Sequence, residues 1–196
     1  MSLAVLDWRR SVAALYRAVR DEPDPAAGHR HWVETRQRLV SEHPASPNAA
    51  AVLRVADYDP QWRFELDLEA NVDAARLEIA TGTDGVVPFE RIGRVAVPQV
   101  GALDVWWLDS YGGGVWLPVR DSSPDTYGGG RYVLDTVKGA DLGGTLDPAN
   151  GGSLVIDFNF AYNPSCAYDE AWACPLAPEG NRVDCVIPVG ELLPGY

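Results

Sequence analysis

After residue 50 the hydrophobic period of this chain changes from that of a helix to that of a β-strand. The clearest run is "WRFELDLEA" (residues 62–70), where apolar and charged residues alternate, as they do on the two faces of a strand. Further strands are predicted at residues 75–81, 89–97, 103–109, 115–121, 131–137, 154–160 and 182–189. No helix-length pattern separates them, which disfavours a parallel α/β sheet. An antiparallel β-barrel or sandwich is therefore predicted.

Two helices are predicted before these strands. The first covers residues 3–20, where apolar residues recur at steps of three and four. "DEPDPAAG" interrupts the pattern, and "HRHWVETRQRLVSEH" (residues 29–43) forms the second helix. In it we expect three residues to face the core, Trp32, Leu39 and Val40, and three to be largely solvated, Arg30, Arg36 and Arg38.

The predicted fold class is therefore α+β and mainly β, with the helices packed against the strands. The length of 196 residues suits one domain. We expect this domain to have a helical segment at residues 1–43, a β domain at residues 50–196, and a long loop motif at residues 157–182.

Composition limits the functions that such a chain can have. The formal net charge is −12, which argues against binding nucleic acid or an anionic membrane. No run approaches the roughly 18 apolar residues of a membrane span, and the first residues do not follow the order of a secretory signal. The three cysteines are expected to be reduced thiols in the cytoplasm. In an oxidising compartment, a disulfide between Cys166 and Cys174 is the alternative.

Two similar strings, "DSYGGGVW" (109–116) and "DTYGGGRY" (125–132), lie about sixteen residues apart. A phosphate-binding loop needs a helix N-terminus after its glycines, and strand-like runs follow both strings instead. The first string is predicted to be a hairpin turn. The second differs in placing Arg131 directly after the glycines.

The second string also carries a family resemblance. Together with "IDFNFAYNPSCAYD", "CPLAPEGNR" and "PVGE", it resembles the bacterial and archaeal family catalogued as domain of unknown function 1684. "HWVETRQRLVSEHPASP" and "DYDPQWRFELDL" are similar to the entry segment of that family, so the resemblance spans roughly residues 28 to 192. Residues 3–20 lie outside it, and "DTVKGADLGGTLDPANGG" (135–152) departs from it as an insertion. The family carries no established activity, so the resemblance implies motif positions and not a reaction.

The motif residues form a polar set that permits two interpretations. Strand alternation places Asp157 and Asn159 on one face, with Asn163 just beyond, and Arg131 offers a planar donor fork for a carboxylate. In the first interpretation Arg131, Asp157 and Glu191 form a structural network that holds the loop at 161–182. In the second they line a pocket where Arg131 anchors an anion and a carboxylate performs acid–base work.

The second interpretation defines a candidate site in a small-molecule binding protein or enzyme that takes a small anionic ligand. The candidate catalytic residues are Asp157, Glu191 and Cys166. The candidate ligand-binding residues are Tyr127, Arg131, Tyr132, Asn159, Tyr162 and Asn163. The alternative is a non-catalytic structural or protein-interaction module. The sequence names no cofactor and no oligomeric state.

The cysteines have alternative interpretations of their own. Buried inert thiols are the ordinary case, and a nucleophilic Cys166 is the chemical one. A metal site would need the cysteines to meet one of the histidines, His29, His31 or His43, near the second helix. No metal site is predicted, because the spacing of eight between Cys166 and Cys174 differs from that of zinc knuckles.

Overall fold

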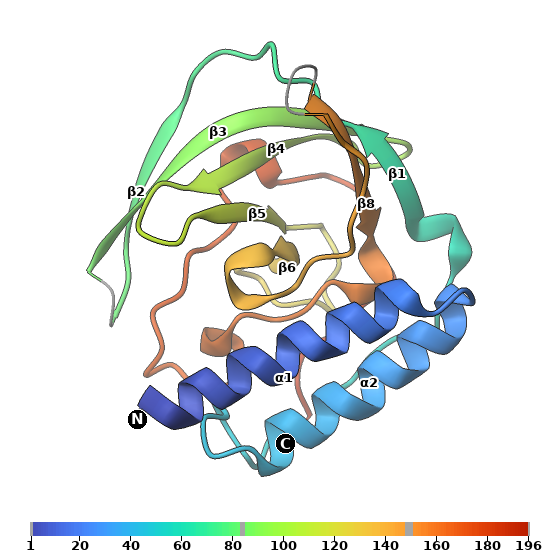
Figure 1. The fold of residues 1–196 in the computed structure, drawn as a ribbon, viewed down its shortest axis with the longest axis vertical. Coiled ribbons are helices and arrows are strands. Elements are labelled where there is room, and N and C mark those ends of the chain that lie inside the picture. Colours follow the sequence, from blue (N-terminus) through green and yellow to red (C-terminus); the bar gives the residue numbers. More distant parts are fainter. Residues whose placement is uncertain (1, 83–84, 148–150, 196) are drawn as a thin grey trace.

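The computed structural model describes residues 2–82, 85–147 and 151–195. The helices are α1 (Ser2–Asp21) and α2 (Pro25–Glu42). The strands are β1 (Arg63–Asp67), β2 (Arg76–Ala80), β3 (Val86–Val97), β4 (Gly101–Leu108), β5 (Gly114–Val119), β6 (Arg131–Asp135), β7 (Leu146–Asp147) and β8 (Gly151–Asp157). They form two antiparallel sheets, ordered β2–β3–β4–β5–β6 and β1–β8–β7. Figure 1 shows α1 and α2 side by side across one end of these sheets. The predicted mainly β fold with two N-terminal helices is confirmed.

The fold is a sandwich and not a closed barrel. Among the described residues the two sheets are linked through isolated bridges, such as the one between Glu69 and Arg94. Their backbones exchange two hydrogen bonds of 2.9 Å. The close approach requires Gly93 at the bulge in β3, since a Cβ there would lie 2.6 Å from a methyl carbon of Leu68.

The larger sheet buries both of its faces. One face packs on the main core, to which the sheets contribute Val95, Leu103, Val105, Leu117, Val133 and Ile156, and the helices Leu15, Tyr16 and Trp32. Because side chains alternate along a strand, the neighbouring residues form an aromatic cluster on the opposite face. This cluster consists of Phe89, Trp106, Trp116 and Tyr132. It is the floor of the site described below.

The helices differ from the prediction in two details. α2 begins at Pro25, four residues earlier than predicted, because the Asp24 side chain accepts a hydrogen bond from the Ala26 amide (3.0 Å) and proline suits the first helical position. The prediction of a largely solvated Arg36 is wrong. Its side chain is 12% exposed and pairs with the buried Glu191.

Two predicted strands also change. No strand forms at residues 182–189, because the carbonyls of Ile187 and Val189 accept hydrogen bonds from Arg131 in place of a neighbouring strand. β8 ends at Asp157, whose carboxylate caps a 3-10 turn, η3 (Phe158–Phe160). Asn159 therefore leaves the strand face that alternation predicts for it.

The glycine strings both connect neighbouring antiparallel strands. In the first, between β4 and β5, the Gly113 amide bonds to the Ser110 carbonyl (3.0 Å), which confirms the predicted hairpin turn. In the second, between β5 and β6, the Gly130 amide bonds to the Tyr127 carbonyl (2.9 Å). The predicted insertion at 135–152 contains a 3-10 turn, η2 (Thr136–Lys138), and β7, while residues 148–150 lie outside the described residues.

Candidate functional site

The nine predicted site residues do not converge on one place. They make separate contacts: Asp157 with Asn159, Glu191 with Asn163 and through its carbonyl with Arg131, Tyr132 with Tyr162, and Cys166 with Tyr127.

Arg131 is fully buried, and its guanidinium binds the chain itself. Three backbone carbonyls accept its hydrogen bonds, those of Ile187 (3.1 Å), Val189 and Glu191 (3.1 Å). Its carboxylate partner is Asp121 at 3.3 Å, so the predicted pairing with Asp157 is corrected. Burial lowers the pKa of Arg131, and the Asp121 charge opposes that shift. A ligand would have to displace these bonds to reach Arg131, so we do not retain it as the anion anchor.

Asp157 is 1% exposed and lines a cavity of about 450 Å³ between the end of α1 and β8. Its carboxylate accepts hydrogen bonds from the Asn159 amide nitrogen (3.0 Å) and side chain (2.7 Å). The nearest cation is Arg63, 3.9 Å away. Burial outweighs these contacts and raises the pKa of Asp157 to about 6. Such a carboxyl can exchange a proton near neutral pH.

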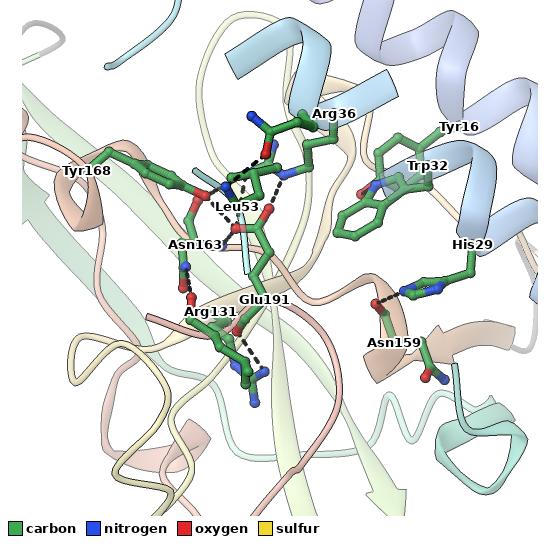
Figure 2. Close-up of polar contacts among 12 residues, drawn as sticks. Tyr16, His29, Trp32, Arg36, Leu53, Arg131, Asn159, Asn163, Tyr168 and Glu191 are labelled. Atoms are coloured by element: carbon green, nitrogen blue, oxygen red, sulfur yellow. Dashed lines mark hydrogen bonds and ion pairs between the residues drawn. The ribbon is translucent and has the colours of Figure 1, made fainter. Parts of the chain in front are cut away.

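Glu191, equally buried, has the opposite surroundings (Figure 2). Arg36 donates from Nε and, at 3.3 Å, from Nη2. The Tyr168 hydroxyl (2.5 Å) and the Asn163 backbone amide (2.7 Å) donate as well. Three of these donors bond to Oε2, and Oε1 receives only the hydrogen bond from Arg36 Nε. Glu191 therefore joins α2 to the C-terminal segment.

Cys166 and Tyr127 form a further contact between predicted residues. The Tyr127 hydroxyl lies 3.5 Å from the Cys166 sulfur, and the Cys174 thiol donates a second hydrogen bond to that sulfur. These bonds outweigh burial and lower the pKa of Cys166 to about 6. Sequence reasoning placed Cys174 among the family motif positions but not in the site.

A cavity of about 620 Å³ opens over the aromatic cluster, within the size range of small-molecule sites. Its walls come from the ends of β2 and β3, the β4–β5 turn, η2 and the loop at 165–175. Tyr132 lines it, and its hydroxyl donates to the Pro175 carbonyl, which ties the loop to β6. Cys174 also lines it.

The floor of this cavity carries an unsatisfied donor. Trp116 is 3% exposed, and its indole N–H has no hydrogen-bond partner among the described residues. An unpaired buried N–H costs about 1–3 kcal/mol. An acceptor atom on a ligand would remove that cost.

One corner of the cavity is basic. The charged lining residues are Arg9 of α1, Asp135 and Lys138. Lys138 pairs with Asp135 at 3.2 Å and lies 5.4 Å from the centre of the Tyr132 ring. Partial desolvation of the half-exposed Lys138 would lower its pKa, but Asp135 raises it above its ordinary value despite the nearby charge of Arg9. Two cations beside one carboxylate leave a net positive corner in an acidic protein.

Two absences hold for the part of the chain that the structure describes. No three of its His, Cys, Asp and Glu side chains gather as metal ligands would, so the three cysteines and a histidine do not form the alternative metal site there. No helix in that part has the length and apolar character needed to cross a membrane.

The comparison with protein-family models shows which family the chain belongs to. The model described as "Protein of unknown function (DUF1684)" matches residues 50–192. The chain belongs to the DUF1684 family. The predicted resemblance is thus confirmed, although the match begins after α2 and not at residue 28. No curated protein matches the chain.

A solved structure supports the fold of this DUF1684 protein. The chain is similar to an uncharacterized protein of Haloarcula marismortui, determined in solution by NMR, with 25% sequence identity and a TM-score of 0.57. The similarity covers 83% of this chain and 91% of the archaeal one. No activity comes with this likeness.

Proposed function

We propose that this DUF1684 protein binds a small organic anion with an aromatic or apolar body in the cavity over the aromatic cluster. The observation that carries the proposal is the unpaired Trp116 indole N–H on the cavity floor. The cluster would pack against the ligand body, the Trp116 N–H would bond an acceptor atom, and Lys138 with Arg9 would attract the anionic group.

The alternative function, a structural module, accounts for a different set of residues. The Arg131–Asp121 and Arg36–Glu191 pairs hold the C-terminal segment, but they leave the cavity and its unpaired donor unexplained. In our proposal these networks keep in place the loop that forms one wall of the cavity.

Anilinonaphthalene sulfonate, a fluorescent aromatic anion, tests the proposal by titration. We expect saturable binding that Lys138→Met weakens about tenfold, equivalent to about 1.4 kcal/mol. Trp116→Phe should weaken it severalfold, because one hydrogen bond contributes about 1 kcal/mol.

The matched control is Arg10→Met, which removes an exposed cation of α1 that does not line the cavity. It should bind the dye as the wild type does. Equal affinity of the wild type and Lys138→Met, or a dye signal that never saturates, would contradict the proposal.

A further inference from the structure

Cys166 and Cys174 are brought together at the edge of the cavity. They lie eight residues apart, and each is partly exposed. The Cys174 thiol hydrogen-bonds to the Cys166 sulfur, and the Tyr127 hydroxyl approaches the same sulfur from the glycine-rich turn. The two sulfurs and the phenol thus form a cluster that is separate from the basic corner of Lys138 and Arg9.

The chain on either side of the pair is anchored. Cys166 lies in a 3-10 turn, η4 (Ser165–Ala167), followed by Tyr168, which is buried and bonded to Glu191. On the other side, Pro175 accepts the hydrogen bond from Tyr132, and the Ala173 carbonyl accepts one from the Gly82 amide (3.4 Å). The two sulfurs are therefore held near each other by the fold.

The neighbours of the two thiols give them unequal reactivity. Hydrogen bonds lower the pKa of Cys166, so at pH 7 it is largely a thiolate, the nucleophilic form. The hydrogen bond with Cys166 and burial raise the pKa of Cys174, which stays protonated. Burial also raises the pKa of Tyr127 to about 12, so its hydroxyl keeps the proton that it donates.

We propose that Cys166 and Cys174 form a redox-active dithiol, with Cys166 attacking a hydroperoxide and Cys174 closing a disulfide. In the first step the Cys166 sulfur bonds to the terminal peroxide oxygen, the O–O bond breaks, and the leaving hydroxide or alkoxide takes a proton from solvent. Cys166 is oxidised to a sulfenic acid and the peroxide is reduced. In the second step the Cys174 sulfur attacks the Cys166 sulfur, the S–O bond breaks, and water leaves with the Cys174 proton. An external dithiol reductant restores the pair.

Cys185 supplies an internal control. Burial and the charge of Asp121 raise its pKa. No hydrogen bond that would stabilise its thiolate comes from another cysteine or tyrosine in the described chain. Cys185 should therefore react with peroxide slowly.

The proposal is tested on the reduced full-length protein with one equivalent of hydrogen peroxide. Mass spectrometry should show the loss of two hydrogen atoms and a peptide cross-link between Cys166 and Cys174, while Cys185 stays free. Cys174→Ala should stop at a Cys166 sulfenic acid that dimedone captures, and Cys185→Ser should react as the wild type does. If Cys185 is oxidised as fast as Cys166, or if no intramolecular cross-link forms, the proposal is wrong.

A second measurement separates this chemistry from a structural role. The rate at which iodoacetamide alkylates Cys166 should rise with pH around a midpoint near 6. In Cys174→Ala and Tyr127→Phe, folded by circular dichroism, the midpoint should move toward the 8.5 or so of an ordinary thiol. An unchanged midpoint in both variants would overturn the assignment.

Discussion

At the scale of single residues, partners and not burial alone decide what a carboxylate does. Asp157 and Glu191 are each 1% exposed. Glu191 lies against Arg36 and receives four hydrogen bonds, whereas the cation paired with Asp157 is the partly exposed Arg63, 3.9 Å away. Asp157 is therefore the carboxyl that titrates near neutral pH.

The Asp157 titration predicts a pH-dependent stability. The pKa of this carboxyl is 3.8 in its ordinary state and about 6 in the fold. Between these values the native state holds a proton that the unfolded chain has lost, so stability falls as pH rises and levels off above about 6.5. The loss is about 3 kcal/mol. Asp157→Asn cannot titrate at this position. Between pH 4 and 7 its free energy of unfolding, measured with urea, should therefore rise by this amount relative to that of the wild type. A pH-independent difference would contradict the prediction.

Some residue positions were readable from the sequence and others were not. Trp32, Arg36 and Val40 are spaced by four, so helical periodicity alone places Arg36 on the buried face of α2. We predicted a solvated Arg36 because arginines are usually exposed, and this general expectation outweighed the helical spacing. The Arg131–Asp121 pair carries no comparable pattern, because its residues lie ten apart at the two ends of the irregular β5–β6 connection.

At the scale of elements, Arg131 supplies the hydrogen-bond donors that a neighbouring strand would otherwise supply to the C-terminal segment. The segment at 187–191 bends at Val189 and Gly190, and the carbonyls of Ile187, Val189 and Glu191 all bond to the guanidinium. The hydrophobic alternation of 182–189 was real, since Ile187 and Val189 are buried. Hydrophobic alternation indicates which face of a segment is buried, but it does not indicate which groups form hydrogen bonds with the backbone. The predicted strand was wrong for that reason.

Arg131→Ala should therefore destabilise the protein by about 3–5 kcal/mol, because it leaves Asp121 buried without its cation. Urea unfolding measures the loss, and hydrogen exchange should locate the first opening at residues 187–193. Arg182→Ala is the control, as its pair with Glu179 is exposed, and it should change stability by less than about 1 kcal/mol. Additive effects of Arg131→Ala and Asp121→Asn in a double-mutant cycle would show that the two side chains are not coupled.

Elements with strong local signals followed the sequence closely, while the candidate site did not. The alternating runs of β1 to β6 and both glycine turns follow from patterns within a few residues of each other. The cavity draws on α1, η2, the larger sheet and the loop at 165–175. Its key residues, Trp116 and Lys138, lie outside the polar motifs that directed attention to Arg131.

At the scale of the whole molecule, the region shared with the family depends on helices that precede it. The family match covers residues 50–192, yet α2 supplies Arg36 to Glu191 and fully buries Trp32 in the main core. The His29 ring also bonds to the Asn159 carbonyl (3.0 Å). Without the helices, the matched region keeps a buried carboxylate that has no cation.

We therefore expect the chain to unfold as one cooperative unit, as the single-domain prediction requires. Circular dichroism at 222 nm, which reports mainly the helices, and near-ultraviolet signals from the aromatic cluster should give the same melting temperature. A fragment of residues 50–196 should lose the cooperative transition, because an unpaired buried charge costs several kcal/mol of a total of about 5–15 kcal/mol.

A shorter deletion provides the control for the fragment. Removing residues 1–7 takes away the start of α1, where Leu3 is 78% exposed and Asp7 pairs with His43 at the surface. This variant should melt within a few degrees of the full chain, since little buried surface is lost. If the fragment of residues 50–196 melts cooperatively at the temperature of the full chain, the helices are an accessory to an independent β domain. Coincident loss of helix and aromatic signals in the full chain, with no cooperative transition in the fragment, makes the Arg36–Glu191 contact part of one folding unit.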